Sequence, residues 1–105
     1  MSPLEARLDG LVVAGQTITY GALARDLGLR ISELAAELEA LMDADAAARR
    51  PFRAVLCCSR HLDGQPALGF FLKAMDLGRL SRDASPLEQA ALVAADRAAL
   101  FLAAR

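Results

Sequence analysis

The sequence has few of the residues that hold metals or disulfides. Its 105 residues include one histidine and two cysteines, which are adjacent at Cys57 and Cys58. Three such side chains are too few for a tetrahedral structural zinc site. Adjacent cysteines also lack the spacing of a disulfide framework or a redox Cys-x-x-Cys motif, so a reducing, cytoplasmic location is expected. There is no phosphate-cradling glycine loop either, and no cofactor is expected.

Neither sign of charge is in excess, and no apolar run is long. Twelve Lys and Arg against 13 Asp and Glu give a formal net charge of −1. This balance excludes a domain that is basic throughout, although it leaves room for a local basic patch. The apolar runs are far shorter than the ~18 residues of a membrane span, so no membrane partner is expected. Charged residues at Glu5, Arg7 and Asp9 interrupt the first apolar stretch, so no signal peptide is expected.

The composition fits a single domain over residues 1–105, since 55% of the residues are hydrophobic and 24% are charged. The sequence Ser-Pro-Leu-Glu, a helix-start signal, occurs at Ser2 and again at Ser85. The second copy begins a helix over 86–104 that is expected to have one narrow solvent-facing side, formed by its polar residues Glu88, Gln89, Asp96, Arg97 and Arg105. Such a helix is either wrapped by its own domain or shared with a partner, and a homodimer through 86–104 is one expectation.

Two further helices are predicted after the helix that begins at Ser2. Thr19 is a suitable N-cap for a short helix over 20–27, which a glycine then ends. A second helix begins near Ser32 and carries an apolar stripe at helical spacing. That helix either runs on through 43–48 or breaks there. Residues 19–49 together predict a helix–turn–helix.

A β-hairpin is predicted to follow. Residues 53–59 read as a strand, because an apolar run without interruption suits a strand buried on both faces. Asp63-Gly64 is the strongest hairpin-turn signal in the chain, and 67–70 then form the returning strand. The fold class predicted is mainly α (α+β): a winged helix–turn–helix with a hairpin wing over 53–70 and a long C-terminal helix.

Residues 15–28 resemble the DNA-binding domain of O6-alkylguanine-DNA alkyltransferases and the alkyltransferase-like proteins. Positions that fit the family pattern are Gly15, Ile18, Thr19, Tyr20, Gly21, Leu23, Ala24 and Gly28. Weaker matches at Arg60, Asp63, Gly64, Gly69 and Phe70 extend the resemblance over residues 10–71. A group of uncharacterised bacterial and prophage proteins has a similar layout.

The resemblance aligns the two cysteines with the catalytic motif of the alkyltransferases. In the alkyltransferases a Pro-Cys-His-Arg motif supplies a thiolate nucleophile, whereas this segment reads Cys57-Cys58-Ser59-Arg60. Cys58 takes the nucleophile's position, Ser59 stands where the activating histidine would be, and His61 comes two places later. A thiol without a neighbouring base is only slightly ionised at neutral pH. Alkyl-acceptor activity at Cys58 is therefore not expected, and both cysteines are interpreted as small buried hydrophobes.

The alkyltransferase-like proteins, which bind DNA without thiol chemistry, are the better comparison. By resemblance, Tyr20 helps to rotate a nucleotide out of the duplex; it could equally be an aromatic anchor between the first helices. Between Ile31 and Asp45 there are five acidic residues and no basic residue. This negative charge opposes insertion of the second helix between the phosphates of a DNA groove. The basic residues near the wing could hold a phosphate backbone, pair with the acidic helix, or remain solvated. The candidate nucleic-acid contacts are Tyr20, Arg30, Ser32, Arg49, Arg50, Arg53 and Arg60.

Two hypotheses about function follow. The first is a non-catalytic winged-helix protein of alkyltransferase-like type that binds duplex DNA weakly or without sequence preference. Sequence preference is not expected because the chain has no asparagine and only one lysine, Lys73, to read base edges. The alternative is a protein–protein interaction or regulatory module that has lost the DNA-binding face.

Overall fold

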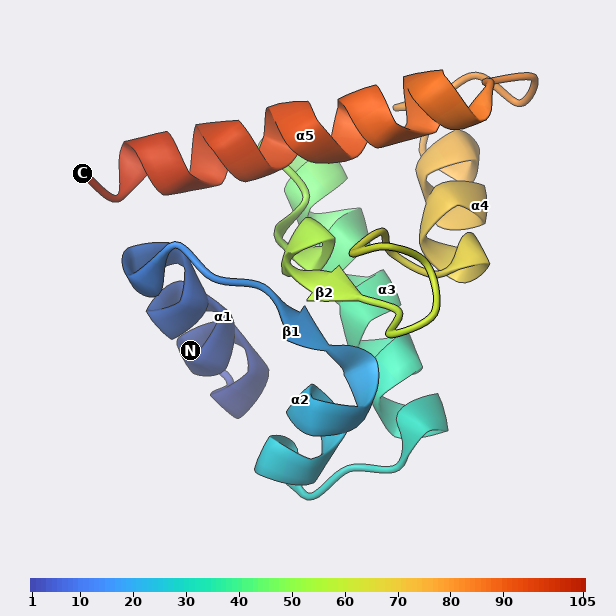
Figure 1. The fold of residues 1–105 in the computed structure, drawn as a ribbon. Coiled ribbons are helices and arrows are strands. Elements are labelled where there is room, and N and C mark those ends of the chain that lie inside the picture. Colours follow the sequence, from blue (N-terminus) through green and yellow to red (C-terminus); the bar gives the residue numbers. More distant parts are fainter.

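The computed structural model covers residues 1–105 and is mainly helical, with one short pair of strands (Figure 1). In chain order the elements are α1 (Pro3–Ala14), β1 (Ile18–Thr19), α2 (Tyr20–Leu27), α3 (Ile31–Ala47), the 3₁₀ turn η1 (Arg53–Leu56), β2 (Cys57–Cys58), α4 (Leu68–Asp76) and α5 (Pro86–Ala103). The α+β class is confirmed at this level. No helix is both long enough and apolar enough to cross a membrane.

The helices begin and end where the capping residues predict. The side chains of Ser2 and Ser85 each accept a hydrogen bond from the backbone of the glutamate three residues later, and each glutamate bonds back. Thr19 caps α2 through the backbone N–H of Ala22, at 3.3 Å. α1 and α2 both stop at glycines in the left-handed conformation, with φ of 67° at Gly15 and at Gly28.

The two helices predicted over 19–49 are both present, and α3 runs on without a break to Ala47. Residues 28–30 join them. α3 begins at Ile31, next to the expected start near Ser32, and Arg30 is its N-cap residue. Arg49 ends this region with a φ of 56°, which is uncommon for a residue with a side chain.

The predicted hairpin wing over 53–70 is wrong. Residues 53–56 form the η1 turn, and only Cys57 and Cys58 form a strand. That strand pairs with β1 in parallel, with Ile18 opposite Cys57. The expected returning strand over 67–70 is instead the start of α4, which begins at Leu68.

Packing explains this difference. The five consecutive residues from Ala54 to Cys58 are all buried, as expected for this apolar run. A two-stranded wing on the surface could not cover both of its own faces, so the run is buried inside the helical domain instead. η1 lies among α1, α3 and α5 and fills the centre of the molecule. The expected returning strand is replaced by α4, in which Phe70, Phe71 and Ala74 are buried together. This is the spacing of one face of a helix.

The turn predicted at Asp63-Gly64 is present. Asp63 and Gly64 both have positive φ, 50° and 78°, as a tight hairpin turn requires. The backbone N–H of Gln65 bonds to the carbonyl of Leu62 at 2.9 Å, and the N–H of Ser59 bonds to the carbonyl of Gln65 at 2.9 Å. The turn therefore closes a loop over 59–65 but does not propagate into a ladder.

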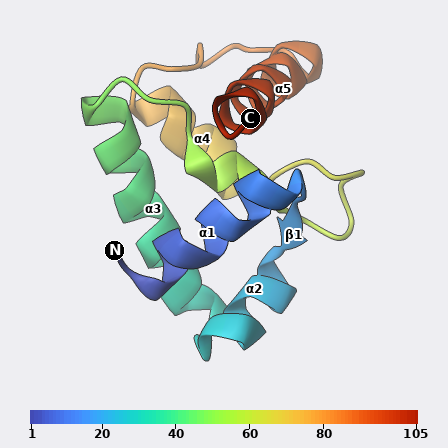
Figure 2. The same cartoon turned by 90° about the vertical axis from the view of Figure 1, so that its left-hand side faces the viewer.

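α5 lies across one end of the molecule, with every other element on one side of it (Figure 1), and Figure 2 shows the same helix nearly end-on. The core is formed by α1, α2, α3, η1 and α4. From the 18 residues of α5 it takes only Val93 as a fully buried apolar side chain. The opposite side of α5 is open to solvent.

Candidate functional site

Tyr20 lies at the point where β1 passes into α2, and it is half-buried. Its hydroxyl accepts a hydrogen bond from the backbone N–H of Ala67 at 3.0 Å, which ties the start of α2 to the start of α4. Burial raises the pKa of Tyr20 to about 12, against a smaller opposing effect of the bond from Ala67. Tyr20 therefore connects α2 to α4, whereas the anchoring role considered for it lay between the first helices.

Tyr20 also lines an apolar groove of about 200 Å³ between α3 and α4. Ile31, Leu34 and Leu38 supply the α3 wall, while Gly69 and Phe70 belong to α4. The only charged residue in the lining is Glu39. Ile31, at the N-terminus of α3, is 56% exposed, so the apolar surface continues from the groove onto the outside of the molecule. No sequence signal marked this groove, because it is formed by segments that are distant along the chain.

The solvent side of α3 is acidic, as the sequence indicated. Glu33, Glu37, Glu39 and Asp43 are all exposed along it, and no basic residue lies within the helix. Lys73 of α4 reaches Asp43 at 2.9 Å, and Arg30 reaches Glu33 at 3.1 Å. Glu37 and Glu39 have no cationic partner within salt-bridge distance.

Two of the candidate DNA-binding arginines are held by a buried carboxylate. Asp45 is fully buried and accepts hydrogen bonds from the backbone N–H and the guanidinium of Arg53, the shortest at 2.8 Å. Arg50 reaches the same carboxylate at 3.2 Å, and Arg53 also reaches Glu5 of α1 at 3.0 Å. Burial lowers the pKa of Arg53, but the hydrogen bonds to Asp45 and Glu5 outweigh it, so the net shift is upward. The Arg53 side chain links α1 to η1 and is not free to hold phosphate.

The other candidates are exposed. Arg30 is exposed but paired with Glu33, and Ser32 is exposed beside it. Arg49 and Arg60 are exposed and have no carboxylate within salt-bridge distance. Of the seven predicted contacts, only these two are arginines without a carboxylate partner.

Both thiols are buried. The Sγ of Cys58 contacts the backbone carbonyl of Ile18 at 3.5 Å, within the strand pair. Burial raises the pKa of Cys57 to about 12. His61 is exposed in the 59–65 loop, and its side chain makes no hydrogen bond to either thiol. The environment therefore suits two small apolar side chains and offers a thiolate no base.

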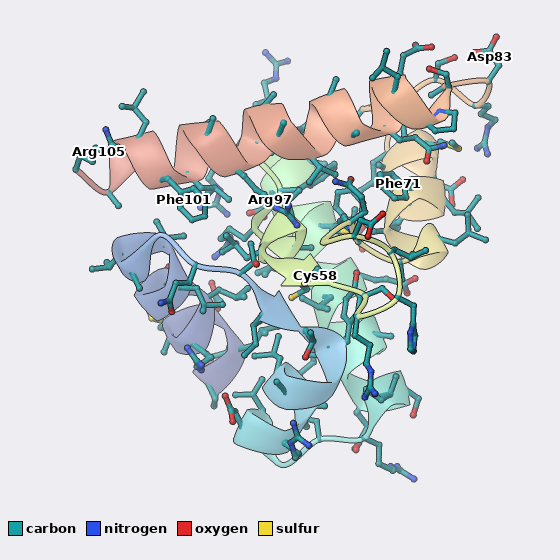
Figure 3. All side chains as sticks on the ribbon, in the orientation of Figure 1. Cys58, Phe71, Asp83, Arg97, Phe101 and Arg105 are labelled. Atoms are coloured by element: carbon teal, nitrogen blue, oxygen red, sulfur yellow. The ribbon has the colours of Figure 1, made fainter.

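Arg97 is a residue whose role sequence reasoning missed. It points from α5 toward the segment that carries Cys58 (Figure 3). Its guanidinium donates to the carbonyl of Val55 at 2.7 Å and to that of Gly64 at 2.8 Å, and so holds the 59–65 loop against η1. Burial lowers the pKa of Arg97. The expected placement of Asp96 and Arg97 on the solvent-facing side of this helix is wrong: both are turned toward the domain, because the buried N–H of Phe52 and the carbonyls of Val55 and Gly64 need polar partners there.

No protein-family model, no curated protein and no solved structure matches this chain.

Proposed function

We propose that this chain is a non-catalytic protein-interaction module, the second of the two functions considered from the sequence. The observation that carries the proposal is the apolar groove between α3 and α4, whose one charged lining residue is Glu39. Ile31 and Glu39 lie on the same helix and both line the groove, so a ligand seated there meets apolar surface and negative charge together.

The same charge disfavours a nucleic-acid ligand at α3. A helix that enters a groove of DNA approaches two rows of phosphates, and carboxylates at Glu33, Glu37 and Glu39 would be repelled along its length. The nearby arginines do not compensate for this, because Arg30 is paired with Glu33 and Arg53 with two carboxylates.

The chemistry of the groove fits a basic amphipathic helix from a partner protein. Such a segment places apolar side chains in a hydrophobic groove and its cations outside it. Glu39, which lines the groove and has no cationic partner, would receive one of those cations. Glu37 faces another side of α3, near Ser2 and Arg53, and takes no part in this contact. The groove volume of about 200 Å³ accommodates one or two large side chains.

The test uses a labelled synthetic amphipathic peptide of leucine and lysine, with leucines along one face, and fluorescence anisotropy at low salt. Ala35 lines the groove, and Ala36 is the next exposed residue of α3 and does not line it. Ala35→Arg and Ala36→Arg therefore change the charge equally, and only the first obstructs the groove. We expect Ala35→Arg to weaken binding about tenfold more than Ala36→Arg, equivalent to about 1.4 kcal/mol. Equal effects of the two variants, or no binding to the wild type, would contradict the proposal.

Nucleic-acid binding of alkyltransferase-like type remains the second candidate, supported by the unpaired Arg49 and Arg60. Backbone contacts through these arginines would give weak, salt-sensitive binding without sequence preference. The test is a low-salt titration with short duplexes, plain and carrying O6-alkylguanine, against the wild type and Arg49→Glu/Arg60→Glu. Binding that the double variant abolishes would support this candidate over the first.

A further inference from the structure

The outer side of α5 carries no polar group between its two ends. Glu88 and Arg105 are exposed at its beginning and just beyond its end, and every exposed residue between them is alanine or leucine. We call the apolar line along this side the α5 stripe; it consists of Leu87, Ala91, Ala94, Ala95, Ala98 and Leu102. Its two leucines are 81% and 68% exposed. A surface helix normally presents polar residues to water at such positions.

The α5 stripe reads the same in both directions. Leu87 corresponds to Leu102, Ala91 to Ala98 and Ala94 to Ala95, and each pair is centred on the point between Ala94 and Ala95. In a two-fold symmetric contact residue i of one chain meets residue j of the other and the reverse, so a stripe with this pattern pairs side chains of equal size along its whole length. When two copies of α5 lie antiparallel about that point, each leucine meets a leucine and alanines meet alanines.

The end charges select the antiparallel arrangement. Antiparallel packing brings Arg105 of each copy to the beginning of the other copy's α5, within about one helical turn of Glu88. Parallel packing would instead place Glu88 against Glu88 and Arg105 against Arg105, both repulsive. The shape of the molecule allows the approach, since the rest of the fold lies on the other side of α5 and Phe101 points inward toward α1 (Figure 3).

We propose that the α5 stripe binds a second copy of this chain, antiparallel about the point between Ala94 and Ala95. From Leu87 to Leu102 the stripe is roughly 23 Å long at 1.5 Å per residue. On one helix face this buries less than the roughly 800 Å² per partner of a standard interface, so the dimer is weak and concentration-dependent. Alanine keeps the two helix axes close, and the leucine pairs fix the register. This contact uses a different surface from the groove between α3 and α4.

Sedimentation equilibrium of the full chain over a wide concentration range tests the proposal. The monomer mass is 11.1 kDa, and we expect the average mass to rise toward twice that value as concentration increases. Ala94→Arg places two cations together at the symmetry axis and should abolish the rise. Ala103→Arg adds the same charge at an exposed position off the stripe and should leave it intact. A monomer at every concentration, or an Ala94→Arg protein that still dimerises, would overturn the proposal.

A cross-linking experiment tests the orientation. Variants Leu87→Cys and Leu102→Cys, each prepared alone, are oxidised separately and as a mixture. Antiparallel packing brings position 87 of one copy to position 102 of the other, so the mixture should cross-link several-fold more than either variant alone. Cross-linking that is equally strong in the separate samples would contradict the antiparallel register.

Discussion

The carboxylate of Asp96 on α5 accepts a hydrogen bond of 2.9 Å from the backbone N–H of Phe52, although the two residues are 44 positions apart. The same carboxylate is 3.0 Å from the guanidinium of Arg79, whose central carbon lies 4.1 Å from the centre of the Phe52 ring. Phe52 is fully buried and joins α3 to η1. Asp96 therefore fixes α5 to the central turn of the fold, and with it the orientation of the α5 stripe.

Replacing Asp96 should be strongly destabilising. Asp96→Ala leaves the buried N–H of Phe52 without an acceptor and Arg79 without its carboxylate. We expect a loss of about 3 kcal/mol in the free energy of unfolding, measured by urea denaturation. Asp96→Asn keeps an acceptor for the N–H and should lose about half as much. If Asp96→Ala unfolds like the wild type, α5 is not held by this contact.

The pH dependence of stability should report the charge of Glu5. Hydrogen bonds from the Ser2 backbone, and then from Arg53, lower the pKa of Glu5 below its ordinary value of 4.5. A lowered folded-state pKa contributes stability above 4.5 that is lost as the pH falls through the folded-state value. Glu5→Gln keeps the capping bond and removes the charge. We expect it to be less stable than the wild type at neutral pH, by a difference that vanishes in strong acid. Glu37→Gln, exposed and unpaired, is the control; a pH-independent difference for Glu5→Gln would contradict this origin.

Titration of Tyr20, the single tyrosine, reports how far the groove shields this side chain from water. Because burial raises the pKa of Tyr20 to about 12, its absorbance in the folded protein should titrate well above the ordinary value of 10. The raised pKa stabilises the fold fully below pH 10, and that contribution is lost as the pH rises through the folded-state value. The midpoint should return to about 10 in denaturant. A folded protein that titrates there already would mean that Tyr20 is open to water.

Both thiols should react slowly with a disulfide reagent at neutral pH. Cys57 and Cys58 are buried, and the pKa of Cys57 is raised to about 12. Arg97→Ala removes the two hydrogen bonds that hold the 59–65 loop over η1. We expect this variant to react about tenfold faster, because local opening exposes Cys58. Arg25→Ala, at an exposed and unpaired position, should react like the wild type. Fast stoichiometric reaction of the wild type would revive the alkyl-acceptor hypothesis.

Helix boundaries were predictable because the signals that set them are local. Ser2, Thr19 and Ser85 cap through bonds to residues three positions away, and the glycines at 15 and 28 need only their own backbone conformation. The Asp63-Gly64 turn is equally local and also formed as predicted.

The wing and the site could not be predicted, because long-range packing decides them. Whether residues 53–58 form a strand or a 3₁₀ turn depends on α1, α3 and α5 closing around them. The partner of Cys57 is Ile18 and not a residue of the hairpin, a choice that no local pattern specifies. Likewise, the sequence does not distinguish Asp45 from the exposed acids of α3, but Asp45 is buried and forms a salt bridge with Arg53.

The most direct test of the proposed function is a pair of low-salt titrations of the same protein, one with the labelled leucine–lysine peptide and one with a labelled duplex. We expect the peptide to bind through the groove, so that Ala35→Arg weakens binding about tenfold more than Ala36→Arg does, and we expect the duplex not to bind. Salt-sensitive duplex binding that Arg49→Glu/Arg60→Glu abolishes, together with peptide binding that Ala35→Arg leaves unchanged, would contradict it.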